Sequence, residues 1–281
     1  MKILVIGGTG MVGARVVEAL LSRGADVRVL SRSPGDRPGV EYVAGDLAAP
    51  ETLIPAFEGV SKLFLLTPLA ENEAELGLIA VAAADEAEVR HIVFHSVHRV
   101  EESPHIPHFK TKIQITEGLK ASGIPYTLLL PNNFDQNDVW LQEPITRFGV
   151  YAQPIGGVGL SRVDVRDIAD AAAIALVEEG HEGKKYALVG PDILTGEDCA
   201  ETWSRHMGRE IRYGGDDLDA WAEQARAMMP DWMVHDLGIM YAHFQEHGLK
   251  ATGEEMAELE GLLGRPPRSF DSFVAELASE W

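Results

Sequence analysis

The chain has 281 residues, with 24 lysines and arginines against 44 aspartates and glutamates, so its formal net charge at pH 7 is −20. This acidity argues against a duplex nucleic-acid binder and against docking on anionic lipid, because both need a basic face. The single cysteine, Cys199, excludes an intrachain disulfide and favours a protein of the reducing cytoplasm.

The chain begins with a strand, a glycine-rich turn and a helix. The apolar run at residues 3–6 predicts a buried strand rather than a signal peptide, and glycines follow at positions 7, 8, 10 and 13. Read from Gly8, the spacing fits G-x-G-x-x-G, which places a dinucleotide pyrophosphate at a helix N-terminus. The alternative is a glycine-rich turn in another kind of α/β protein. The residues predicted to bind the cofactor here are Gly7, Thr9, Gly10, Met11, Val12 and Gly13.

Strands and helices alternate through the first two thirds of the chain. The pattern predicts strands at residues 26–30, 42–44, 62–66, 91–95 and 126–130, and helices at 51–57, 73–87 and 109–122. Such alternation predicts an α/β fold with a doubly wound parallel sheet, whose ligands bind beyond the carboxyl ends of the strands. The segments at that edge are Ser31-Arg32, Asp46-Leu47, Thr67-Pro68, Ser96 and Asn132-Asn133-Phe134.

The regular alternation loosens after residue 140. We expect a helix over 168–177 with Asp167 as its N-cap, a strand near 186–189, a helix over 195–207 and a last helix capped by Ser269. Residues 1–155 are predicted to form a dinucleotide-binding domain. Residues 156–281, interleaved with it, would complete the fold and add a smaller, mostly helical lobe for substrate. No apolar run approaches the ~20 residues that span a bilayer.

A methionine and aromatic stripe runs through the predicted C-terminal helices. Met233, Leu237, Met240 and Phe244 recur at helical spacing, which is typical of core packing. The second interpretation is that such side chains roof an apolar pocket, because methionine and tryptophan form adaptable walls. Cys199 is interpreted as a packing residue of a helix.

The end of the second strand indicates which dinucleotide binds. An NAD site usually has a carboxylate there, whereas this chain reads Leu30-Ser31-Arg32-Ser33 and has no carboxylate before Asp36. The guanidinium of Arg32 matches a 2′-phosphate, and Ser31 adds a hydroxyl. We therefore expect NADP(H), with NAD(H) as the second candidate. The alternative is that Arg32 is a solvated loop charge.

Taken together, these residues resemble the NmrA-like group of atypical short-chain dehydrogenases/reductases, over most of the chain. The resemblance implies a Rossmann domain with a smaller C-terminal lobe. Members include NAD(P)H-dependent quinone reductases and other reductases, and also regulators that bind the dinucleotide without turnover. The motifs that carry it are the turn at 7–13, Arg32, Gly45-Asp46-Leu47, Ser96, Thr111-Lys112 with Glu117, 127–134, 163–170 and 265–273.

The resemblance also implies roles for single residues. Asp46 and Leu47 would flank the adenine, and Thr67 and Pro68 would line the ribose and phosphates. Lys112 would reach the nicotinamide ribose. The residues implied at the border of nicotinamide and substrate are Pro131, Asn132, Asn133 and Phe134.

The catalytic position departs from the superfamily's best-known pattern. Classical enzymes have a tyrosine four residues before the lysine, and here that position is His108. The candidate catalytic set is Ser96, His108 and Lys112, in which a neutral imidazole donates a proton and a hydroxyl polarises the substrate oxygen. The alternatives are an exposed histidine in a proline-rich loop before the helix, and quinone reduction that needs no dedicated acid.

Two histidine pairs raise the question of a metal. His95 and His98 end a strand, and His105 and His108 lie around Pro107, so neither pair has the helical setting and further ligands that zinc needs. We expect no metal site.

Three functions are compatible with these residues. The first is an NADPH-dependent oxidoreductase that reduces an apolar, quinone-like or aromatic carbonyl compound. The second is a redox sensor that binds NAD(P) without catalysis and regulates a protein partner, as the missing tyrosine suggests. The third is an isomerase or related enzyme that retains its nucleotide. The substrate and the oligomeric state, with a homodimer among the candidates, stay open.

Overall fold

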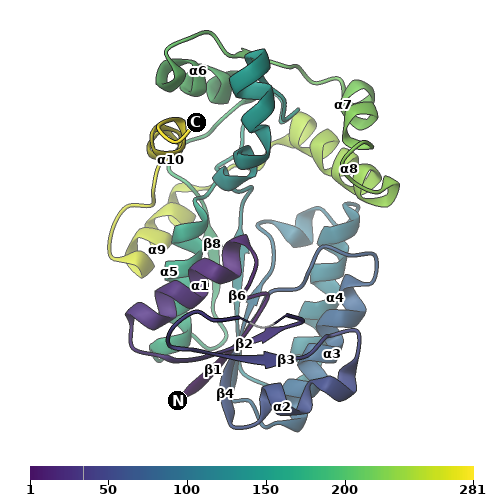
Figure 1. The fold of residues 1–281 in the computed structure, drawn as a ribbon, viewed down its shortest axis with the longest axis vertical. Coiled ribbons are helices and arrows are strands. Elements are labelled where there is room, and N and C mark those ends of the chain that lie inside the picture. The colour runs from purple at the N-terminus through teal and green to yellow at the C-terminus, as the bar shows by residue number, and fades with distance from the viewer. Residues whose placement is uncertain (34) are drawn as a thin grey trace. The chain divides into compact units, whose positions relative to one another are not determined.

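The computed structural model describes residues 1–33 and 35–281, which form two compact units (Figure 1). The sheet unit consists of Met1–Pro131 and Val165–Ala187, and the C-terminal unit of Asn132–Asp164 and Leu188–Trp281. The two units are interleaved along the chain, because the chain passes from one to the other three times.

A seven-stranded sheet in the order β3-β2-β1-β4-β5-β6-β8 organises the fold. The first six strands of this order follow the arrangement of doubly wound dinucleotide-binding folds, and pairs such as Leu4 with Leu63 are parallel. The strands are β1 Lys2–Ile6, β2 Asp26–Ser31, β3 Val40–Ala44, β4 Val60–Leu65, β5 His91–His95, β6 Tyr126–Pro131 and β8 Lys185–Leu188. The predicted α/β fold with a doubly wound parallel sheet is confirmed.

Helices cover both faces of this sheet within the sheet unit. Helix α1 packs against α5 and helix α3 against α4, so each pair is a layer of its own (Figure 1). The helices of the sheet unit are α1 Met11–Ser22, α2 Ile54–Phe57, α3 Glu73–Glu86, α4 Pro107–Ser122 and α5 Val165–Val177.

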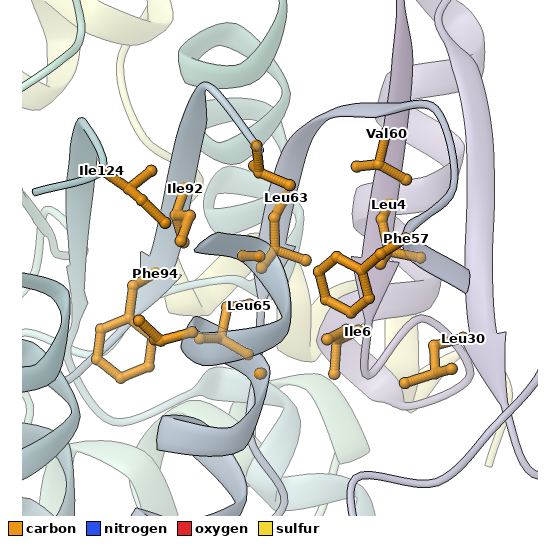
Figure 2. Packing of buried hydrophobic residues seen from close by; sticks show 14 of the residues in the cluster. Leu4, Ile6, Leu30, Phe57, Val60, Leu63, Leu65, Ile92, Phe94 and Ile124 are labelled. Atoms are coloured by element: carbon orange, nitrogen blue, oxygen red, sulfur yellow. The ribbon is translucent and has the colours of Figure 1, made fainter. Parts of the chain in front are cut away.

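The apolar core under α2, α3 and α4 follows from strand alternation. Leu4 and Ile6 of β1, and Leu63 and Leu65 of β4, share one face because side chains of a strand alternate in direction. They pack with Phe57 of α2 in one buried cluster, as Figure 2 shows. Burial of both sheet faces explains why the central strands are nearly continuous apolar runs.

Two helix starts differ from the predictions. Helix α4 begins at Pro107 rather than at Phe109, because the fixed φ of proline suits the first helical position. Helix α5 begins at Val165, so the prediction that Asp167 is its N-cap was wrong. Asp167 lies instead in the first turn, where the helix dipole favours a carboxylate.

The C-terminal unit is mostly helical, as predicted. Thr195 caps α6 and Ser269 caps α10, each accepting a hydrogen bond from a backbone N–H. Met240, Phe244 and Cys199 are buried, which confirms their predicted packing roles. The elements are β7 Val150–Tyr151, α6 Gly196–Met207, β9 Arg212–Tyr213, α7 Leu218–Ala225, α8 Asp231–His247, α9 Gly253–Leu263 and α10 Phe270–Ala278. Within the described residues, no helix is long and apolar enough to cross a membrane.

Candidate active site

The glycine turn after β1 is closed by its own backbone. Gly10 donates its N–H to the carbonyl of Gly7 at 3.0 Å, and Gly7 has a φ of +81°, which favours glycine. A Cβ on Gly13 would lie 2.1 Å from the Gly7 carbonyl oxygen, so the first turn of α1 packs directly on the loop. The third glycine of the G-x-G-x-x-G motif is therefore required by sterics, because no side chain fits at position 13.

The N-terminus of α1 is suited to an anion. Gly10 is the N-cap, no described side chain caps the helix, and its first turn holds no acidic residue. The first N–H groups of a helix have no partner within the helix, and the helix dipole adds positive potential there. These uncapped donors fit the pyrophosphate of a dinucleotide.

Polar residues follow the carboxyl ends of β2 and β3, at the same edge of the sheet as the glycine turn after β1. Arg32 follows β2 and is exposed, and within the described residues its guanidinium has no hydrogen-bond or ion-pair partner. The hydroxyl of Ser31 accepts the N–H of Ser33 at 3.2 Å. Past β3, Asp46 accepts the N–H of Ala48 at 3.0 Å, and Leu47 is buried in the core.

Lys112 is buried in a polar cluster beyond the ends of β4 and β5. Its ammonium lies 2.6 Å from Oε1 of Glu73, donates to Oγ1 of Thr67 at 2.8 Å, and lies 5.5 Å from the centre of the Phe94 ring. Thr67 is one of the residues predicted from the edge of the sheet, whereas its neighbour Pro68 is exposed. Glu73 is new, because the sequence identified it only as the start of a helix.

Ser96 directly follows β5 and is fully buried. Its backbone N–H donates to the Leu129 carbonyl at 2.8 Å, but its hydroxyl has no hydrogen-bond partner among the described residues. Buried hydroxyls nearly always have a partner. Because residues two apart in extended backbone share a face, Ser96 and Phe94 point the same way, and Phe94 contacts Lys112. The orphaned hydroxyl is therefore a fitting donor for a bound substrate oxygen.

His108 lies in the first turn of α4, not in the proline-rich loop that the sequence suggested. It is half-buried, with its ring edge-on to Phe109 at a centroid distance of 4.8 Å. Lys112 is four positions further along the helix, so the two side chains lie on one face of it. His105 precedes the helix and is exposed. In the described parts of the chain, no three histidine, cysteine or acidic side chains are arranged to hold a metal.

Pro131 is the last residue of β6, and the C-terminal unit begins directly after it with Asn132, Asn133 and Phe134. Asn132 is buried and ties this segment to the chain after α8, because its side-chain Nδ2 donates to the Leu249 carbonyl at 2.7 Å. The Oδ1 oxygen of the same side chain accepts the N–H of Asn133 at 2.8 Å. Phe134 forms a parallel bridge with Val163.

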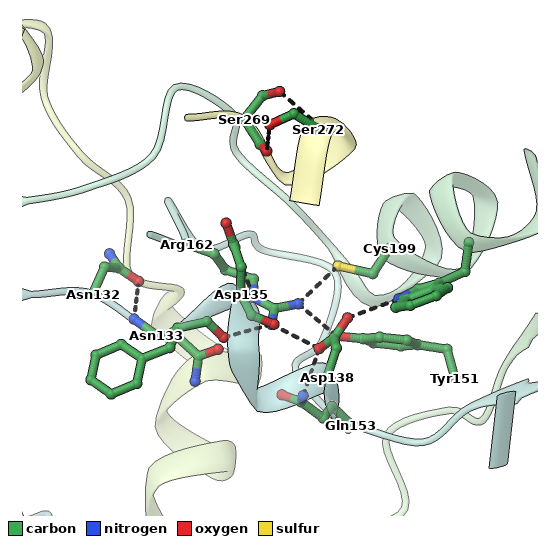
Figure 3. Close-up of polar contacts among 12 residues, drawn as sticks. Asn132, Asn133, Asp135, Asp138, Tyr151, Gln153, Arg162, Cys199, Ser269 and Ser272 are labelled. Atoms are coloured by element: carbon green, nitrogen blue, oxygen red, sulfur yellow. Dashed lines mark hydrogen bonds and ion pairs between the residues drawn. The ribbon is translucent and has the colours of Figure 1, made fainter. Parts of the chain in front are cut away.

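A buried charged network, which the sequence did not indicate, lies behind this segment. The Arg162 guanidinium donates to Asp138 at 2.8 Å and to the Phe134 carbonyl at 2.7 Å, and both charged side chains are fully buried (Figure 3). Tyr151 and Trp203 also donate to Asp138, at 3.2 and 2.9 Å.

Titration in this network follows burial and charge. Burial is the largest single influence and lowers the pKa of Arg162, but Asp138, Tyr151, Cys199 and Asp135 together outweigh it and raise that pKa well above its usual value. Burial raises the pKa of Cys199 to about 12, although Arg162 lies 3.5 Å from its sulfur and opposes the shift. The thiol is therefore unreactive at neutral pH, and the network joins distant residues of the C-terminal unit through hydrogen bonds.

Comparison with known proteins places the chain among reductases. The chain is 31% identical over 280 residues to an NAD(P)H azoreductase of Xenophilus azovorans, covering 97% of this chain and 96% of the relative. NADPH-dependent quinone oxidoreductase QOR2 of Escherichia coli, solved with NADPH, superposes with a TM-score of 0.88 at 25% identity, over 98% of this chain and 99% of the other. Citrobacter triphenylmethane reductase, solved with NADP(H), gives 0.86 at 26% identity, over 98% and 99%.

The family assignment rests on the whole chain. The model of the NmrA-like family matches residues 1–273, which include the glycine turn, both units and the start of the last helix. The resemblance drawn from the sequence motifs is confirmed. This chain belongs to the NmrA-like family of Rossmann-type proteins.

Proposed function

We propose that this chain transfers a hydride from NADPH to an apolar substrate, a quinone-like or aromatic carbonyl compound. It is an NAD(P)H-dependent oxidoreductase, as its named relatives are. The observation that carries the proposal is the glycine turn with its uncapped helix N-terminus. The dinucleotide, when bound, supplies the hydride, and the protein supplies position and hydrogen bonds.

Arg32 supports NADPH over NADH. It is exposed directly after β2, where a carboxylate would select the ribose hydroxyls of NADH, and a guanidinium there suits a 2′-phosphate. Ser31 would add a hydroxyl donor at the same strand end.

Ser96, His108 and Lys112 are the residues that we propose to act in the reaction. The Ser96 hydroxyl would donate to the substrate oxygen, where negative charge develops as the hydride arrives. His108 would supply the proton that completes reduction to the alcohol or hydroquinone, and with quinones water can supply it instead. Lys112 would bind the cofactor ribose through an N–H.

The C-terminal unit supports an apolar substrate. Helices α7 and α8 carry half-buried Trp221, Trp232 and Met233, and Trp221 packs edge-on against Tyr241 at 5.0 Å. Aromatic rings and methionine form adaptable apolar walls, which suit planar aromatic compounds better than charged ones.

The test is NADPH oxidation by the purified protein with a panel of quinones and aromatic carbonyl compounds. We expect turnover with at least one quinone, and a lower kcat with unchanged NADPH affinity in Ser96→Ala. Tight NADPH binding without turnover on any compound would reject the proposed reaction. If pulldown partners then changed with the cofactor's redox state, the chain would be a sensor that regulates a protein partner.

A further inference from the structure

Glu73 is a buried acid that no motif of the site assigns. It is the first residue of α3, only 1% of it is exposed, and Oε1 lies 2.6 Å from the Lys112 ammonium. The two residues are 39 positions apart in the sequence, so the pair exists only in the folded sheet unit.

Glu73 is itself held from three sides. Its Oε1 accepts the hydroxyl of Thr67 at 2.6 Å, and its Oε2 accepts the hydroxyl of Thr111 at 2.8 Å. The N-terminus of α3 adds a favourable dipole for the carboxylate. The Thr67 hydroxyl in turn accepts from Lys112 at 2.8 Å, so carboxylate, hydroxyl and ammonium close a ring of hydrogen bonds.

The stability of the fold alone is a weak reason for this arrangement. Two charges removed from water lose their hydration, and a buried ion pair is often no better than an apolar pair of the same volume. The benefit is geometric, because an ammonium on a flexible four-carbon chain becomes fixed. An ammonium has three N–H donors and two acceptors are found for it among the described residues, so one N–H remains for a further acceptor.

We propose that Glu73 is a positioning residue that acts through Lys112: with Thr67 and Thr111 it fixes the ammonium so that the third N–H meets a hydroxyl of the bound cofactor. The inference rests on the proposed role of Lys112 in NADPH binding. It adds that this role depends on a carboxylate from α3.

A double-mutant cycle between Glu73 and Lys112 tests this coupling. The first readout is the NADPH dissociation constant from fluorescence titration, and the second readout is kcat. We expect Glu73→Gln and Lys112→Gln each to weaken binding or lower kcat/KM by about tenfold to 100-fold. The double variant should be no worse than Lys112→Gln alone, because Glu73 has no role once the ammonium is gone. Glu73→Asp should recover part of the loss.

Glu75→Gln is the matched control, because Glu75 lies in the same first turn and is exposed. If Glu73→Gln behaves like this control, or if the two effects multiply in the double variant, the inference is wrong. If Glu73→Gln does not fold, Thr111→Val replaces it in the cycle. The effect of Thr111→Val on NADPH binding or kcat/KM must then disappear when Lys112→Gln is already present. Unchanged binding and turnover in Lys112→Gln would instead reject the proposed role of Lys112, and wild-type protein that binds no NADPH would reject the proposed function itself.

Discussion

Replacing Gly13 by alanine probes the packing of the glycine turn against α1. The added Cβ would lie 2.1 Å from the Gly7 carbonyl oxygen and 2.6 Å from its carbon, and both are backbone atoms. Restoring ordinary contact requires the turn or the helix to move by about 1 Å. Overpacking of this kind costs about 1–3 kcal/mol, partly offset by the ~1 kcal/mol that alanine gains over glycine inside a helix.

The assay pairs urea unfolding with NADPH titration. Gly13→Ala should lower the free energy of unfolding and weaken NADPH binding at least tenfold, because the displaced turn no longer presents its N–H groups correctly. Gly261→Ala is the control, since Gly261 also lies within a helix and a Cβ added there would meet nothing within 4 Å. That variant should gain up to about 1 kcal/mol in stability and bind NADPH normally. Wild-type affinity in Gly13→Ala would refute the reasoning.

Three further predictions concern charge. Burial lowers the pKa of His91 from 6.5 to about 4, so the unfolded chain takes up a proton first as pH falls, and the stability that this histidine contributes is complete above pH 6.5 and reduced by up to about 2 kcal/mol at pH 5. Urea titrations should show this loss added to that of His95, whose pKa burial lowers to about 3, and the fall should be less steep in His91→Gln. Arg32→Ala should weaken NADPH binding about tenfold and leave NADH unchanged, because only NADPH carries the 2′-phosphate; equal losses for both would count against a phosphate contact. Arg162→Met leaves Asp138 as an uncompensated buried charge and should cost about 3–5 kcal/mol, whereas Arg147→Met at an exposed pair should cost at most about 1 kcal/mol by the same unfolding assay.

The sequence was sufficient for the sheet because its signals are local. The strands of the first two thirds are short, mostly apolar segments between turn residues, and the glycine turn is a motif of seven consecutive positions. The helix starts at Pro107 and Val165 were misplaced, because helix ends depend on which backbone groups find partners.

The polar networks of both units could not be predicted, because they join residues far apart in the chain. Lys112 and Thr67 are 45 residues apart, and Trp203 and Asp138 are 65 apart. The motif identified Lys112. Nothing in the sequence distinguishes its carboxylate partner, Glu73, among 44 acidic residues, because only the fold brings the two together. The roles of Ser96, His108 and Lys112 in catalysis stay predictions.

The interleaving of the two units has a consequence for biosynthesis. Helix α5 packs against α1, yet the two are separated by more than 140 residues of chain, which include a whole segment of the C-terminal unit. A ribosome must therefore release residue 187 before the sheet unit can be complete, and until then the apolar face of α1 lacks its neighbour. Such long-range closure slows folding and prolongs exposure to aggregation, so nascent chains of this protein should depend on chaperones late in synthesis.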